Sequence, residues 1–147
     1  MKVFDLPPLW TLLCFGSVLA LDRMLPLDLF GMAGRVVGAA AVLAGLGLML
    51  AAVLRMRAAA TTVIPHRAPS ALVTGGVFRW SRNPIYLGDV LVVLGVTLWI
   101  DAPLGLLMLP VLMAVLTRRF ILPEEAKLAA AFGPDFADWC LRTRRWL

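Results

Sequence analysis

The chain has 147 residues, of which 61% are hydrophobic, and its mean hydropathy is +0.89. A soluble domain has about 45–50% apolar residues, so this composition excludes a soluble globular protein and indicates an integral membrane protein. The net charge of +5 does not indicate nucleic-acid binding, because the basic residues flank apolar segments instead of forming a polar patch. No repeat or long linker divides the chain, so we expect one membrane-embedded domain, residues 1–147.

Four apolar segments predict an all-α, polytopic protein with about four transmembrane helices. They are roughly Leu9–Leu21, Val36–Leu54, Ile85–Ile100 and Ala102–Thr117. The N-terminus resembles a signal peptide, because Lys2 precedes an apolar run. However, Asp5 and the Pro7-Pro8 pair interrupt the charged region, which favours an uncleaved first membrane helix.

The third and fourth segments have about 16 residues each and are separated by Asp101 and Pro103. At 1.5 Å per residue, 16 residues reach about 24 Å, which is short of a bilayer core of about 30 Å. In one long helix Asp101 would lie in the middle of the membrane. The sequence therefore favours a tight helical hairpin in a locally thinned bilayer.

The distribution of basic residues predicts the orientation. With four spans, twelve of the lysines and arginines lie on the side of both termini, and only Arg23 and Arg35 lie on the other side. This bias predicts that both termini and the polar middle loop are cytoplasmic. The small size and the form of the motifs suggest a bacterial inner membrane.

The C-terminal segment is expected to form two short helices. Pro123, followed by Glu124 and Glu125, is typical of a helix N-terminus, where proline and carboxylates are both favoured. Gly133-Pro134 should close this helix. A second helix, Asp135–Thr143, would then carry Phe136, Trp139 and Cys140 on a membrane-facing side.

A metal centre and a soluble nucleotide-binding fold are both unexpected. The chain has one histidine, His66, and two isolated cysteines, Cys14 and Cys140, without the spacing of a metal site or a disulfide motif. No Gly-x-Gly-x-x-Gly pattern follows a strand.

Two polar segments are the candidate site, because polar groups at a membrane edge are costly without a function. The first is Leu72–Gly88, which contains Arg82, Asn83, Pro84 and the single tyrosine, Tyr86. Pro84 leaves nearby peptide groups free to bind a ligand. Tyr86 is either an interfacial anchor or a ligand contact. Asp89, one turn into the third span, is either a water-accessible edge residue or part of a substrate cavity.

The second segment contains Arg118 and Arg119, followed by the two glutamates 124 and 125. These residues are either ordinary flanking arginines and helix-dipole carboxylates, or groups that bind an anionic and a cationic ligand part. The helical hairpin brings this segment to the same membrane face as the first, which favours the second interpretation. His66 lies in a proline-flanked loop, where a structural or exposed role competes with catalysis.

The runs LVTGGVFRWSRNPIYLG and RRFILPEEAKLAAAFGPDFADWCLRTRRWL resemble the isoprenylcysteine carboxyl methyltransferase and phospholipid methyltransferase superfamily of membrane enzymes. The shared pattern is Leu-Val-x-x-Gly-x-aromatic, Arg-(His/Asn)-Pro-x-Tyr, a helical hairpin, then Glu-Glu-x-x-Leu-x-x-x-Phe-Gly and an aromatic-rich basic tail. The resemblance covers about half of the chain, Leu72 to Leu147.

The resemblance implies a cytoplasmic pocket for S-adenosylmethionine, built from helix ends and the C-terminal helices. Leu72 and Val73 would lie along the cofactor, and Phe78 would pack on it. Asn83, Pro84 and Tyr86 would shape the pocket around its adenosine and methionine parts. Glu124 would hold a polar group of the cofactor, either the amine or the ribose, with Glu125 in support.

This chain departs from the isoprenylcysteine enzymes at three positions. Ser70 stands where those enzymes have a histidine, Asn83 replaces the histidine of Arg-His-Pro, and their substrate arginine aligns near Phe120, beside Arg119. These departures concern prenylcysteine specificity and leave the cofactor pocket intact.

The function expected from the sequence is methyl transfer from S-adenosylmethionine to a membrane-partitioned lipid or isoprenoid. A carboxylate acceptor needs only an arginine, Arg119 or Arg82, to position it. An amine or thiol acceptor must first lose a proton, with help from His66, Glu125 or Tyr86. The alternatives are an NADPH-dependent reductase of the sterol-reductase type, which the short loops disfavour, and a non-catalytic helical membrane protein.

Overall fold

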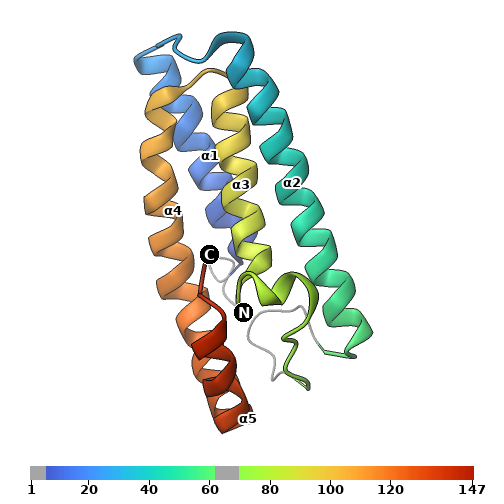
Figure 1. Ribbon diagram of the computed structural model, residues 1–147. Coiled ribbons are helices and arrows are strands. Elements are labelled where there is room, and N and C mark those ends of the chain that lie inside the picture. The colour runs from blue at the N-terminus through green and yellow to red at the C-terminus, as the bar shows by residue number, and fades with distance from the viewer. Residues whose placement is uncertain (1–5, 62–69) are drawn as a thin grey trace.

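The computed structural model describes residues 6–61 and 70–147, which form an elongated helical bundle (Figure 1). The described residues contain no strand, so the all-α prediction is confirmed. The described residues form the α-helices α1 (Pro7–Met24), α2 (Gly31–Ala58), α3 (Pro84–Trp99), α4 (Met108–Leu116) and α5 (Leu122–Arg142). Two 3-10 turns, η2 (Gly76–Arg79) and η3 (Pro103–Leu107), and a π turn, η4 (Thr117–Ile121), complete the described elements.

Helices α2 and α3 pack closely along a seam of glycines. A Cβ atom on Gly38 would lie 2.5 Å from the carbonyl oxygen of Gly95, and one on Gly45 would lie 2.7 Å from that of Gly88. Small residues allow such a backbone approach, which drives helix association where lipid removes the hydrophobic effect. The seam fixes the position of α3, whose first turn carries predicted site residues.

The hairpin between α3 and α4 is confirmed, and its loop has a further role. Asp101 adopts a left-handed conformation (φ 59°) and accepts hydrogen bonds from the backbone N–H groups of Leu29, Phe30 and Gly31 at 2.7–2.9 Å. These bonds satisfy donors at the start of α2 and hold the pKa of the Asp101 carboxyl below its usual range. Asp101 therefore fastens the hairpin to α2 at the end of the bundle opposite α5 (Figure 1).

The helix start predicted at Pro123 is found within one residue, at Leu122, with Glu124 and Glu125 in the first turn, but no break separates this helix from the fourth span. Helix α4 continues through η4 into α5, with Pro123 in the first turn of α5. Proline lacks an N–H and clashes with the carbonyl four residues earlier, and the π turn just before it widens the helix there. The predicted boundary at Gly133 is confirmed, because its backbone (φ 46°, ψ −117°) separates α5 into two helical parts.

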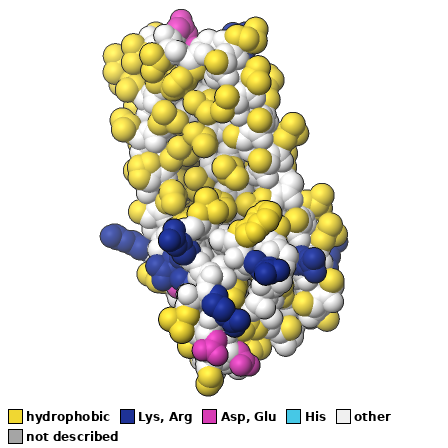
Figure 2. All heavy atoms as spheres, in the orientation of Figure 1, with side chains coloured by type: hydrophobic (Ala, Val, Ile, Leu, Met, Phe, Trp, Pro, Cys, Tyr) yellow, Lys and Arg dark blue, Asp and Glu magenta, His cyan; other side chains and the backbone are white. Residues whose placement is uncertain are grey.

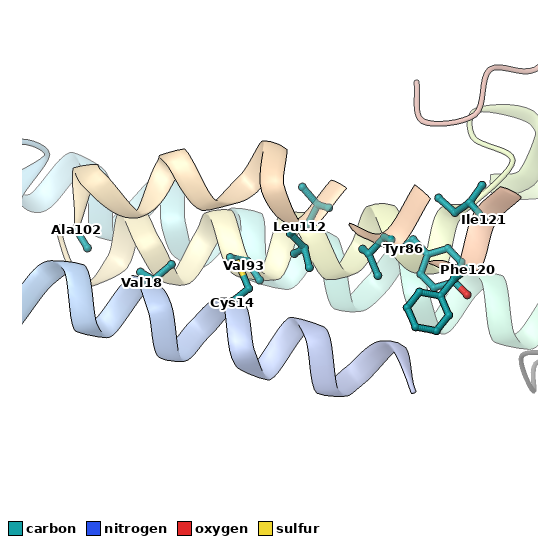
Figure 3. Close-up of a cluster of buried hydrophobic side chains, with 10 residues drawn as sticks. Cys14, Val18, Tyr86, Val93, Ala102, Leu112, Phe120 and Ile121 are labelled. Atoms are coloured by element: carbon teal, nitrogen blue, oxygen red, sulfur yellow. The ribbon is translucent and has the colours of Figure 1, made fainter. Parts of the chain in front are cut away.

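Two buried clusters position the ends of these helices. The first joins α1, α3, α4 and η4 and contains Val18, Val93, Leu116 and Phe120 (Figure 3). The second joins α2, η2 and the last part of α5 through Ala52, Phe78, Phe136 and Trp139.

The outer surface matches a membrane protein. Two helical stretches, α2 and the run Pro103–Arg142, are long and apolar enough to cross a bilayer, and α3 is a shorter apolar helix. Figure 2 shows hydrophobic side chains over most of one face, while lysines and arginines gather toward one end. The count of four spans stays a prediction.

Candidate active site

A cavity of about 390 Å³ lies at the end of the bundle where α3 begins and α5 is found (Figure 1). Its walls come from the start of α1, the second half of α2, residues 71–73, η2, the first turns of α3, and α5. Predicted residues from both polar segments line it, namely Leu72, Val73, Phe78, Arg82, Asn83, Pro84, Tyr86, Glu124 and Glu125. The hairpin thus brings the two segments together, although the role of each residue stays a prediction.

Two predicted catalytic residues are not placed with this group. Arg119 does not line the cavity, and its guanidinium lies 5.1 Å from the ring centroid of Trp10. The π turn explains this position, because it leaves Arg119 exposed and turns Phe120 into the core. His66 lies outside the described residues.

Tyr86 and Glu124 form the first polar contact of the cavity wall. The Tyr86 hydroxyl donates a hydrogen bond of 2.8 Å to Oε1 of Glu124, which joins the first turn of α3 to that of α5. The Tyr86 ring is 7% exposed and lies 6.2 Å from the Phe120 ring centroid (Figure 3). Packing therefore fixes the tyrosine, and the tyrosine orients the carboxylate.

Glu125 forms the second polar contact, with two arginines. Arg145 donates from Nη2 to Oε2 at 2.7 Å and from Nε to Oε1 at 3.0 Å, and Nη1 of Arg82 lies 3.4 Å from Oε1. Hydrogen bonding to Glu125 raises the pKa of Arg145. Nη1 of Arg82 also contacts Sγ of Cys140. Nε of Arg82 is buried and has no hydrogen-bond partner among residues 6–61 and 70–147.

The C-terminal tail fastens the Arg82-Asn83-Pro84 segment. The Arg82 N–H donates to the Arg144 carbonyl at 2.9 Å, and Nδ2 of Asn83 donates to the Arg145 carbonyl at 3.0 Å. The Ser81 hydroxyl donates to the same carbonyl at 3.3 Å. The sequence pattern indicates Arg144 and Arg145 only as basic residues that orient the chain in the membrane. No local pattern indicates these contacts, which join residues 62 to 64 positions apart.

An aromatic wall faces this polar side. Phe78, Phe136 and Trp139 all line the cavity, and Nε1 of Trp139 donates to the Phe78 carbonyl at 3.3 Å. The expectation that Phe136 and Trp139 face the membrane is wrong, since they are only 7% and 5% exposed. The kink at Gly133 allows this face to pack against Ala52 and Phe78. The sequence predicted the kink, but it did not predict that the kink turns Phe136 and Trp139 into the core.

Asp89 also lines the cavity, one turn after Tyr86 on α3. Met49 and Met56 of α2 contribute apolar surface to the walls. Among the described parts of the chain, no group of three or more His, Cys, Asp or Glu residues could hold a metal ion. The cavity therefore offers carboxylates, one orphaned guanidinium N–H and a large apolar and aromatic wall.

A comparison with protein-family models matches residues 33–135 to the family described as phospholipid methyltransferase. The match covers more than two thirds of the chain, from α2 to just past the kink in α5. No curated protein and no solved structure matches the chain.

Proposed function

Because the chain belongs to the phospholipid methyltransferase family, and is therefore a methyltransferase, we propose that S-adenosylmethionine is its methyl donor. The acceptor is a lipid-like or isoprenoid molecule held in the bilayer. The observation that carries the proposal is the cavity itself, in which the Tyr86–Glu124 pair and the Arg82–Glu125–Arg145 cluster face an aromatic wall.

The residues present fit such a donor. The cavity volume of about 390 Å³ lies within the range of about 300–1,000 Å³ that is typical of small-molecule sites. Glu124 would bind the donor's ammonium or ribose hydroxyls, and the orphaned Nε of Arg82 would be satisfied by its carboxylate. Phe78 and Trp139 would pack on the adenine ring.

When bound, S-adenosylmethionine supplies a methyl carbon that its sulfonium already activates. The task of the protein is then to align the acceptor and to exclude water, and little acid–base chemistry is needed at the donor. Leu72 and Val73 would shield one side of the cavity, and Pro84 and Tyr86 would fix its floor. Glu125, held by two arginines, would keep Arg82 in place.

The proposed membrane arrangement has α1, α2, α3 and α4 as spans, with both termini and the cavity on the cytoplasmic side. The gathering of basic side chains toward one end of the bundle supports it (Figure 2). Leu6 and Pro8 line the cavity and are also exposed. An apolar acceptor would therefore reach the cavity from the bilayer at the start of α1, and the soluble donor from the cytoplasm.

A thermal-shift series on the detergent-purified protein tests this proposal. A ligand that binds only the native state raises its apparent stability. We expect stabilisation by S-adenosylmethionine and S-adenosylhomocysteine, and none by NADPH. Stabilisation by NADPH alone would favour a reductase, for which the family match gives no support. No shift with any ligand, in detergent and again in lipid nanodiscs, would favour a non-catalytic protein.

A further inference from the structure

Asp89 is a carboxylate inside an apolar helix, and the site described so far does not use it. It lies three residues after Tyr86 on α3, which places it about 4.5 Å further along the helix axis, away from the cavity end. Residues three apart share one helix face, and both line the cavity. An ionisable residue in a membrane span is costly and marks a functional site by default.

Arg82 and Lys127 line the same cavity, but no ion pair joins Asp89 to a lysine or arginine among the described residues. The neutral side chain of Thr11 on α1 lies near the Asp89 carboxylate, and the Thr11 hydroxyl donates to the Pro7 carbonyl at 3.4 Å. Glu125, in contrast, is paired with Arg82 and Arg145. A half-buried carboxylate next to a neutral hydroxyl is suited to receive a positive charge or a proton from a ligand.

The other groups that sequence analysis named as bases are already occupied. Both oxygens of Glu125 are bound by guanidinium groups. The Tyr86 hydroxyl donates a hydrogen bond to Glu124 and keeps its proton, so this phenol is not free to act as a base. Asp89 is thus the described cavity carboxylate best placed to accept a proton.

The position of Asp89 also suits the acceptor more than the donor. It lies near Thr11 of α1, and Leu6, Pro7 and Pro8 at the start of that helix line the same cavity with apolar side chains. Glu124 and the aromatic wall, which would hold the donor, belong to α5 and η2. An acceptor that arrives along the start of α1 therefore meets Asp89.

From this geometry we infer that Asp89 is the catalytic residue that binds and deprotonates a protonated amine on the acceptor. This inference rests on the proposed function. The acceptor ammonium gives one proton to the Asp89 carboxylate, and the nitrogen lone pair then attacks the methyl carbon. The new C–N bond forms as the C–S bond breaks, and the electron pair of that bond converts the sulfonium into a neutral thioether. The product is a methylated ammonium, so charge and protons balance.

The test uses acceptors that differ only in their nucleophile: dodecylamine, dodecanethiol and dodecanoate, with phosphatidylethanolamine as a second amine. We expect the wild-type protein to methylate the amines. Asp89→Asn should lower kcat for them about 100-fold or more, which is the usual contribution of a general base. Binding of S-adenosylhomocysteine should be unchanged. The control Asp138→Asn, an exposed carboxylate on α5 outside the cavity lining, should methylate amines like the wild type.

A neutral acceptor separates deprotonation from a purely structural role. O-Dodecylhydroxylamine is uncharged at pH 7, so it needs no base before attack, and Asp89→Asn should methylate it nearly as fast as the wild type. If Asp89→Asn fails to fold, Asp89→Leu, which suits an apolar helix better, carries the same expectation.

Two results overturn the inference while donor binding keeps the proposed function intact. They are amine methylation that is unaffected in Asp89→Asn, and wild-type methylation of the carboxylate or thiol without the amines. A wild-type protein that does not bind S-adenosylhomocysteine removes the proposed function and this inference with it.

Discussion

The two ends of the bundle use carboxylates in opposite ways. At the hairpin end, the Asp101 carboxylate accepts hydrogen bonds from three backbone N–H groups. These bonds hold the loop together and leave little capacity for a ligand. At the cavity end, Glu124 accepts a hydrogen bond from the Tyr86 hydroxyl, and Asp89 lies near the side chain of Thr11. A carboxylate saturated by backbone donors stabilises structure, whereas one that lines a cavity can contact a ligand.

The largest expected effect comes from the glycine seam that both ends share. In Gly95→Leu a side chain would meet the Gly38 carbonyl oxygen at 2.5 Å and the Val42 backbone nitrogen at 2.7 Å. Backbone atoms cannot move aside cheaply, so α2 and α3 should separate and the protein should not fold. Gly47→Leu is the matched control, because no atom lies within 4 Å of its Cβ position. Size-exclusion chromatography in detergent measures the yield of folded protein, and normal yield from Gly95→Leu would contradict the seam.

Glu124→Gln should weaken ligand binding at the cavity end and leave the structure of the hairpin end unchanged. It removes the charge that would bind the donor, and a hydrogen bond to a charged group contributes about 1.5–3 kcal/mol. We therefore expect the affinity for S-adenosylhomocysteine to fall about 10- to 100-fold, measured by isothermal titration calorimetry, with little change in the melting temperature of the unliganded protein. Unaltered affinity would remove Glu124 from the site.

Arg145→Gln should have a smaller effect on the same end. Glu125 would lose its bidentate partner and keep only Arg82, whose Nη1 is 3.4 Å away. Because Arg145 acts through Glu125, we expect about a 10-fold loss of donor affinity, with kcat at saturating donor nearly retained. Arg142→Gln is the control, since its Nε donates only to the Asp138 carbonyl on the same helix. Equal donor affinities in Arg145→Gln and Arg142→Gln would mean that the Arg145 side chain does not position the groups that bind the donor.

Asp101→Asn should give the smallest effect, confined to the hairpin end. Asparagine keeps an acceptor oxygen but loses the charge, so we expect a melting temperature a few degrees lower and unchanged donor affinity. The pKa of Asp101 is depressed in the folded state. Its stabilisation is therefore complete above the unfolded pKa of about 3.9 and is lost as the pH falls through the lower folded pKa. The difference in melting temperature between wild type and variant should thus be constant near neutral pH and shrink upon acidification below about pH 4. A difference that persists at pH 3 would mean that the charge contributes nothing.

Sequence alone determined the features that depend on local pattern. Hydropathy indicated a helical membrane protein, and Asp101 with Pro103 marked the hairpin. That hairpin was enough to predict that Asn83, Pro84 and Tyr86 would approach Glu124, because two helices joined by a tight turn place their far ends side by side. Gly133-Pro134 marked the kink in α5. Each of these inferences needs only periodicity, composition or backbone preference over a short stretch.

Only the tertiary structure decided which side chains complete the cavity. Arg145 reaches Glu125 across 20 residues of sequence, and Asp101 reaches Phe30 across 71. The π turn moved Arg119 away from the cavity, and the kink at Gly133 turned Trp139 toward it. Small changes in helix phase decide these outcomes, since one extra residue in a turn rotates every later side chain by about 100°. This rotation cannot be predicted from composition or from a local pattern. The sequence therefore indicated where the site lies, and the packing of the helices determined which side chains line it.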